Sequence, residues 1–266
     1  MGVGMADVEY LSDRGHLPAG RGAVLDIGSQ NLFNVTRPAV EKFARHHGAR
    51  ITDRELQREA DRLSYFSTPR PGERTTYLSE LFDLTPDLFY TSYDVCPALR
   101  TEIFDLNTEN LPAAYRNRFD VVMNCGTTEH VINQMNSFRV MHDAVKPGGI
   151  IFHQVPSIGW LDHGYFTYHP TFFDDLKVAN DYELVDRWYV PERIMTLDAG
   201  TVDIRSPYTP QVPRSVAPEQ VSIGVQCFNL SVVLRKVHDR SFRVGLELAT
   251  SHSGLSDVMQ SNYEVV

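Results

Sequence analysis

The first buried strand expected in the chain, with the turn that follows it, reads Val24-Leu25-Asp26-Ile27-Gly28-Ser29-Gln30-Asn31. An apolar run that breaks at a carboxylate and a glycine is typical of a buried parallel strand that ends in a tight turn. In an open α/β sheet, ligands bind beyond the carboxyl ends of the strands, near the point where strand order reverses. The stretch therefore predicts a nucleotide-binding turn. It is not the dinucleotide fingerprint Gly-x-Gly-x-x-Gly, because Ser29, Gln30 and Asn31 replace the further glycines.

Two further stretches repeat the strand-to-turn pattern. One reads Phe119-Asp120-Val121-Val122-Met123-Asn124-Cys125-Gly126-Thr127-Thr128-Glu129-His130 and precedes an expected helix over Val131 to Val145. The other reads Lys146-Pro147-Gly148-Gly149 and precedes an expected strand over Ile150 to Val155. In this order, the three stretches resemble the class I S-adenosylmethionine-dependent methyltransferases, and the resemblance covers Val24 to Val155 most firmly.

The resemblance implies a fold, a cofactor and an activity. The fold is α/β, a Rossmann-like, doubly wound, mostly parallel sheet with an antiparallel edge strand, for which Val221 to Val237 is the candidate. The cofactor is S-adenosyl-L-methionine, and the activity is methyl transfer. The cofactor-binding residues that it implies are Asp26, Gly28, Ser29 and Gln30 at the methionine part, Asp94 at the ribose, Asp105 and Leu106 at the adenine, and Cys125 and Gly126. Gln30 departs from the family's usual glycine.

The second strand has two candidate positions. Leu88 to Tyr93 is a full-length strand and would place Asp94 at the ribose. Ala49-Arg50-Ile51 with Asp53 better matches the usual spacing of about 20 residues after the first turn, but it offers only three strand residues. We favour the longer strand. A short third strand, Thr101 to Phe104, then ends at Asp105.

The remaining chain is organised around this domain. Residues 1–22 read as a polar lead-in, and 23–237 as one methyltransferase domain. Within it, 35–87 forms a helical insertion or cap, and 156–169 and 205–219 form loops on the active-site side. The insertion includes a helix from Pro38 towards Gly48 and one that opens with the capping box of Thr52 and Glu55. Residues 238–266 form a tail that the pattern does not place.

Composition limits the functional classes. A formal net charge of −9 disfavours nucleic acid as a partner, and three widely spaced cysteines indicate neither a disulfide framework nor a zinc site. No stretch has the length or apolarity of a membrane span or secretory leader. We therefore expect a soluble, cytoplasmic protein that acts on a small-molecule substrate, with no membrane partner. Homo-oligomerisation stays open.

Histidines are the candidate acid–base groups. His163, in a loop rich in aromatic residues, is the preferred general base, and His130, at the end of the fourth strand, is the second candidate. Each histidine also has a structural interpretation. His163 could be a solvated loop residue, and His130 could be bonded to the backbone at the start of a helix. His153 and His169 read as structural. No metal site is predicted, because Glu129, His130, Asp162, His163 and His169 lack a diagnostic spacing.

The acceptor pocket is expected between residues 67–87 and 156–169. Its substrate-binding residues are Glu129, Trp160, Asp162, Tyr165 and Tyr77. An aromatic wall that also includes Phe82 and Phe166 predicts a planar or partly apolar acceptor. The histidines favour O-methylation by in-line displacement. N- or C-methylation and a cofactor-fold binding protein without activity are the alternatives, and a nicotinamide-dependent oxidoreductase is disfavoured because the glycine fingerprint is absent.

Overall fold

The main sheet contains seven strands: β2 (Gly22–Ile27), β4 (Leu88–Asp94), β5 (Thr101–Ile103), β6 (Phe119–Cys125), β7 (Val145–Ile158), β8 (Glu183–Asp198) and β9 (Ser222–Arg235). Their order across the sheet is β5-β4-β2-β6-β7-β9-β8. The computed structural model describes residues 2–68, 72, 74–160, 163–198 and 222–246. The predicted loop at 205–219 lies outside the described residues, as does the tail beyond residue 246.

Strand order reverses at β2. From β2 the chain adds β4 and β5 on one side, then returns to add β6 and β7 on the other, and all these pairs are parallel. β9 runs antiparallel to both β7 and β8. The predicted fold class is confirmed. The antiparallel strand lies one position inside the edge, between β7 and β8.

The strand ends meet at one edge of the sheet. Ile27, the last residue of β2, pairs with Tyr93 of β4 and with Asn124 of β6. The turns after these three strands are therefore level with one another. The second-strand prediction, Leu88 to Tyr93, is confirmed, because β4 pairs with β2 along its whole length. The rival stretch at 49–51 is irregular and lies between α2 and α3, outside any strand.

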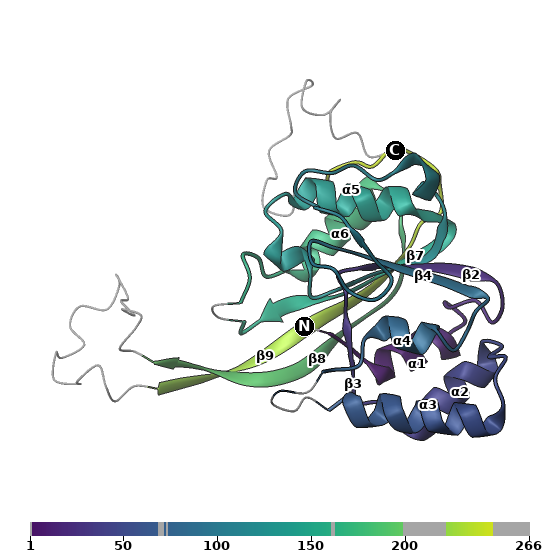
Figure 1. Cartoon of the computed structure of the whole chain (residues 1–266). Coiled ribbons are helices and arrows are strands. Elements are labelled where there is room, and N and C mark those ends of the chain that lie inside the picture. Colours follow the sequence, from purple (N-terminus) through teal and green to yellow (C-terminus); the bar gives the residue numbers. More distant parts are fainter. Residues whose placement is uncertain (1, 69–71, 73, 161–162, 199–221, 247–266) are drawn as a thin grey trace, which may run out of the picture.

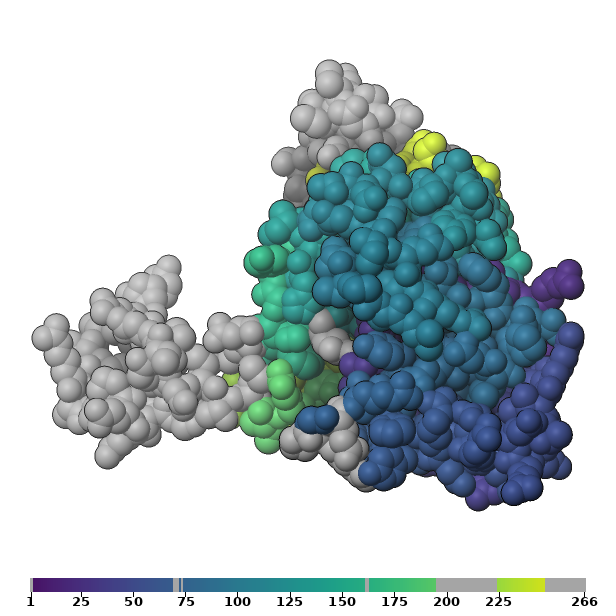
Figure 2. Space-filling model, in the orientation of Figure 1, coloured from purple at the N-terminus to yellow at the C-terminus, as the bar shows by residue number. Residues whose placement is uncertain are grey.

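Helices cover both faces of the sheet (Figure 1). α1 (Met5–Asp13), α2 (Arg37–His46), α3 (Asp53–Phe66) and α4 (Leu78–Phe82) share one core with the side chains of Val24, Met123 and Phe152. α5 (Gln134–Ala144) and α6 (Pro170–Ala179) share the other core with Leu25, Val122 and Ile151. In the space-filling view, the blue lobe at the lower right is the 35–87 region, below the teal surface of the chain from about residue 90 onward (Figure 2).

Local capping sets where the helices begin. Thr36 accepts a hydrogen bond from the Ala39 amide at the start of α2, and Thr52 with Glu55 forms the predicted capping box of α3. The helix expected from Val131 begins three residues later, at Gln134, because the Asn133 side chain caps it. The stretch Val131–Asn133 instead follows a short 3-10 turn, η2 (Thr128–His130).

The first 22 residues contain more structure than a lead-in. β1 (Gly2–Gly4) pairs in parallel with β3 (Asn31–Phe33), and α1 buries Met5, Val8 and Leu11. These apolar residues are spaced three apart, but the nine-residue helix has a weakly amphipathic pattern, which weakens its signal in the sequence. The N-terminus is thereby placed next to the turn after β2.

β8 and β9 continue beyond the rest of the sheet. The β7–β9 ladder ends where Ile158 pairs with Phe228, whereas the β8–β9 ladder continues to the pair of Asp198 with Ser222. We call this two-stranded extension the arm (Figure 1). The described part of the tail, 238–246, has no regular secondary structure and lies beside α5, where His142 donates from Nε2 to the Arg240 carbonyl at 2.7 Å. No helix within the described ranges combines the length and apolarity needed to cross a bilayer.

Candidate active site

The turn after β2 packs directly on the turn after β6. Gly28 has φ of +104°, and a Cβ built there would lie 2.3 Å from Thr127 Oγ1 and 2.7 Å from Gln30 Nε2. Only glycine fits this conformation and this contact together. Gln30, in the position where the resemblance expects glycine, is buried and donates from Nε2 to Thr127 Oγ1 at 3.0 Å. Its side chain thus links the two turns.

Replacing Gly28 with alanine should destabilise the fold more than the same change at Gly148. Both residues have positive φ, but the space around Gly148 is open, whereas a Cβ at Gly28 meets Thr127. We expect about 1 kcal/mol from backbone strain at Gly148, and a further 1–3 kcal/mol at Gly28 from the displaced side chains. Urea unfolding of the two variants measures the difference. Equal losses would show that the turns have room to separate.

Asp26 lies behind the turn. It is fully buried, its Oδ2 accepts a 2.7 Å hydrogen bond from the Tyr90 hydroxyl, and its Oδ1 has no partner. Burial raises the pKa of Asp26 to about 8, and the hydrogen bond from Tyr90 offsets only part of that rise. The sequence placed Asp26 at the cofactor, but the structure places it under the turn, outside the pockets described below.

Asp94, at the end of β4, is held by two backbone amides. Ser29 N donates to Oδ2 at 2.8 Å, and Cys96 N donates to Oδ1 at 2.9 Å. Each oxygen keeps a further lone pair for a ligand hydroxyl. Asp53, the alternative acid, is exposed on α3 and pairs with Arg45 at 2.9 Å. Asp94 is therefore the acid that lies at the point where strand order reverses.

A pocket of about 330 Å³ opens at this point, and we call it the switch-point pocket. It has a polar side, which includes Asp94, and an apolar side, which includes Leu106. Asp105 forms a turn there by accepting hydrogen bonds from Asn107 N at 2.8 Å and Thr108 Oγ1 at 3.0 Å, which lower its pKa. The lining residues are Ser29, Gln30, Tyr93, Asp94, Val95, Phe104, Asp105, Leu106, Asn107, Gly126, Thr127, His130 and Val131.

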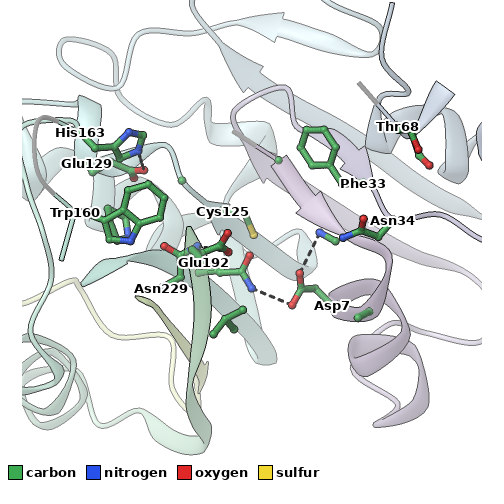
Figure 3. A pocket seen from close by; sticks show the side chains of 18 residues that line it. Asp7, Phe33, Asn34, Thr68, Cys125, Glu129, Trp160, His163, Glu192 and Asn229 are labelled. Carbon is green, nitrogen blue, oxygen red and sulfur yellow. Dashed lines mark hydrogen bonds and ion pairs between the residues drawn. The ribbon is translucent and has the colours of Figure 1, made fainter. Parts of the chain in front are cut away.

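A second pocket of about 540 Å³ adjoins the first at Gly126, which lines both. We call it the acidic pocket, after Asp7, Glu129 and Glu192 (Figure 3). Its wall combines the N-terminal segment, the segments after β3, α3 and β6, the end of β7 with the loop that follows, and neighbouring residues of β8 and β9. The lining residues are Gly2, Gly4, Ala6, Asp7, Phe33, Asn34, Ser67, Thr68, Cys125, Gly126, Glu129, Gln154, Pro156, Trp160, His163, Val190, Glu192 and Asn229.

Glu129 lies on η2 beside the junction of the pockets. Its side chain is 0% exposed, and neither carboxylate oxygen has a hydrogen-bond partner. Burial raises the pKa of Glu129 to about 7. The loop after β7 folds over it: Tyr165 N donates to the Glu129 carbonyl at 2.7 Å, and a Cβ at Gly164 would lie 2.9 Å from Glu129 Cγ. Gly164 is therefore required for this close approach.

His163 and His130 both face the Glu129 carboxylate. Their Nε2 atoms lie 3.7 Å and 3.9 Å from Glu129 Oε1, and their rings are 5.2 Å apart. Burial lowers the pKa of each imidazole, so both are neutral at pH 7 and can accept a proton. His163 lines the acidic pocket and is 18% exposed, whereas His130 lines the switch-point pocket and is 46% exposed.

These three side chains also have the geometry of a candidate metal centre. Each offers one ligand atom, and the atoms lie within 4.8 Å of one another. Two imidazoles and a carboxylate are a donor set used by divalent transition metals. The sequence showed no such pattern, because His163 is 33 residues from His130 and only the fold brings them together. His153, in contrast, is buried beside Asn124, and burial lowers its pKa to about 3.

Several predicted substrate residues lie elsewhere. Tyr165 is 68% exposed and Tyr77 lines neither pocket, while Asp162 lies outside the described residues. Cys125, predicted at the cofactor, lines the acidic pocket instead. Among the aromatic residues expected to form the wall, Trp160 lines the pocket, whereas Phe82 belongs to the core between α2 and the sheet. Trp160 therefore supplies part of the expected aromatic wall, and the rest of the lining combines apolar and polar side chains.

The structure adds three groups that the sequence did not suggest. Asp7 comes from α1, Glu192 from the arm, and Asn229 from β9 just before the arm begins. Asp7 occupies the third position of its helix and accepts a hydrogen bond from Gly4 N at 3.1 Å, a capping signal visible in the sequence. Glu192 and Asn229 carry no such signal, because their position depends on how β8 and β9 pair.

No protein-family model matches the sequence, and no curated protein matches it. Solved structures do match. One is a provisionally assigned methyltransferase from Bacillus halodurans C-125, with 12% identity, 88% of this chain and 100% of that chain covered, and a TM-score of 0.42. Another is TehB from Haemophilus influenzae, with 10% identity, 86% and 62% covered, and a TM-score of 0.40.

A third is a SAM-dependent methyltransferase from Methanosarcina mazei, with 10% identity, 85% and 96% covered, and a TM-score of 0.33. Identities and TM-scores this low carry no information on substrate or site residues. The sheet order and the two adjoining pockets described above stand on this chain's own geometry.

Proposed function

We propose that the protein transfers a methyl group from S-adenosylmethionine to a hydroxyl group of a small molecule. The observation that carries this proposal is the junction at Gly126, where the switch-point pocket and the acidic pocket meet. A group held in one pocket lies next to a group held in the other, as a displacement between two bound molecules requires.

The residues of the switch-point pocket fit S-adenosylmethionine. Asp94, fixed by two amides, offers lone pairs to the ribose hydroxyls, and Leu106 with Val131 offers apolar contact to a planar base. Asp105 and Asn107 offer polar groups beside that base. When bound, this cofactor supplies a methyl group on a sulfonium, which an oxygen nucleophile can displace in line.

His163 is the proposed general base. Its neutral imidazole lines the acidic pocket, and the buried Glu129 carboxylate 3.7 Å away stabilises the imidazolium that forms. The acceptor hydroxyl gives its proton to His163 as the new oxygen–carbon bond forms. His130 is the second candidate base, at 3.9 Å from the same carboxylate.

Asp94→Ala should weaken S-adenosylmethionine binding, whereas Asp53→Ala should not. The loss of a charged acceptor corresponds to about 1.5–3 kcal/mol, or roughly 10- to 150-fold in Kd. Calorimetric titration of the two variants and the wild type gives both values, and Asp53 is a matched control because it is an exposed acid far from the pocket. Equal affinities would contradict the proposed ribose contact.

Titration combined with an activity assay separates the alternative functions. Binding of S-adenosylmethionine without methyl transfer would identify a binding protein. Binding of a nicotinamide dinucleotide in its place would identify an oxidoreductase. The net charge of −9 supports a small-molecule acceptor over nucleic acid. The three cysteines, which are all free, support a reducing, cytoplasmic setting.

A further inference from the structure

The ionisable side chains of the acidic pocket are acids and one imidazole. Among the described residues that line it are Asp7, Glu129, Glu192 and His163, with no lysine or arginine. Arg193 is the nearby cation, and its guanidinium packs on the Trp160 ring at 5.3 Å instead of lining the pocket. A ligand in this pocket therefore meets carboxyl groups on several sides.

Amide groups in the pocket wall are already used by two of these acids. Gln154 donates from Nε2 to Asp7 Oδ1 at 2.9 Å, and Asn229 donates from Nδ2 to Glu192 Oε1 at 3.0 Å. Figure 3 shows Glu192 beside Asn229, and the hydrogen bonds that Asp7 accepts. The acids are thereby oriented, and their remaining lone pairs act only as hydrogen-bond acceptors.

Glu129 lacks even such a partner. Both of its carboxylate oxygens are buried without a hydrogen bond, beside the junction with the switch-point pocket. A buried acceptor without a donor is costly, so a bound molecule that donates to it gains that free energy. The imidazoles of His163 and His130 face Glu129 Oε1 at 3.7 Å and 3.9 Å, beyond hydrogen-bond distance, so a bound ligand can supply the donor.

We infer that the acceptor is a polyhydroxylated molecule without negative charge, such as a neutral or amino-substituted sugar ring. This inference rests on the proposed function and names the substrate class of that site. Hydroxyl and amino groups supply donors for Glu129, which has none, and for the remaining lone pairs of Asp7 and Glu192. The hydroxyl that reacts donates its proton to His163, and a neighbouring hydroxyl or amino group of the same ring donates to Glu129.

The same lining rejects anions. A phosphate or carboxylate in the pocket would face three carboxyl groups with no cation from the described lining to compensate. Phe33, Trp160 and Val190 supply apolar contact between the polar side chains, which suits the C–H faces of a ring that also carries hydroxyl groups. The volume of about 540 Å³ lies within the range of small-molecule sites.

A ligand panel tests the inference on the full-length protein with S-adenosylhomocysteine bound. The panel contains methyl pyranosides, the corresponding amino sugars, and the sugar phosphates and uronic acids with the same ring configurations. Calorimetry or saturation-transfer NMR should detect neutral or amino members that bind at least about 10-fold more tightly than their anionic counterparts. Glu192→Lys should reverse this preference, because it places a cation in the pocket wall.

Glu183→Lys is the matched control, since Glu183 lies on the same strand outside the pocket, paired with Arg235. It should leave the preference unchanged. Anionic members that bind as tightly as neutral ones, or a panel in which none binds, would overturn the inference. Binding of S-adenosylmethionine is measured in a separate titration. If the cofactor binds but the panel shows no preference for neutral sugars, the inference about the acceptor fails and the proposed function stands.

Discussion

His163→Ala should lower methyl-transfer turnover by about 10²- to 10⁴-fold while S-adenosylmethionine affinity stays within about 2-fold of wild type. The physical reason is that His163 lines the acidic pocket beside Glu129, whereas it does not line the switch-point pocket. Turnover is measured as S-adenosylhomocysteine release with an acceptor from the sugar panel, and affinity by calorimetry.

His169→Ala is the control for this change. His169 precedes α6 and makes no side-chain cap hydrogen bond, so both readouts should match the wild type. Turnover of His163→Ala within a few-fold of wild type would contradict the base. Loss of wild-type turnover in EDTA would contradict it as well, since the Glu129, His130 and His163 cluster would then be acting on a metal ion.

The folded protein should lose stability as pH rises from about 4 to about 8, and Asp26→Asn should remove much of that loss. The pKa of Asp26 is raised from 3.8 to about 8 in the folded state, so the folded state retains a proton that the unfolded chain releases above pH 4. The stabilisation is complete below the unfolded pKa and is lost as pH passes the folded pKa. The predicted loss is at most about 6 kcal/mol.

Urea unfolding at pH 5 and pH 8.5 measures the effect. The wild type should have a lower midpoint at pH 8.5, and Asp26→Asn a smaller difference between the two conditions. Asp53→Asn should behave as the wild type, because Asp53 is exposed. Glu129, with a pKa raised to about 7, adds a smaller loss of the same sign. His153, whose pKa burial lowers to about 3, contributes a change of the opposite sign below about pH 6.5, so the comparison with Asp26→Asn is the decisive one. A pH difference in Asp26→Asn as large as that of the wild type would contradict the buried, protonated Asp26.

The sequence predicts the sheet well because its strands carry strong local signals. β2, β4 and β6 are apolar runs that end at acidic or polar residues, and each was placed within one or two residues. The choice of Asp94 over Asp53 followed from strand length alone. The helix of the N-terminal 22 residues was missed because its apolar positions are few and diluted by polar neighbours.

The site was harder to predict, because its residues come from distant parts of the chain. The location of Asp94 and Gly126 in the site can be predicted, because both residues come at the ends of strands that the sequence identifies. Asp7, Glu192 and Asn229 depend on how α1 and the arm pack, which no local pattern encodes. Tyr90 was read only as a strand residue, although its hydroxyl is the hydrogen-bond partner of Asp26.

The arm has a consequence for how the acidic pocket can vary. Beyond Phe228, β8 and β9 hydrogen-bond to each other and no longer to β7, so the part of β8 that carries Glu192 belongs to a ribbon only two strands wide. Such a ribbon opens at a much lower free energy than the centre of a sheet. One wall of the pocket can therefore loosen while the strand ends that hold Asp94 and Gly126 stay fixed. Substitutions in this two-stranded ribbon can therefore change which acceptor binds, without altering the residues of the switch-point pocket.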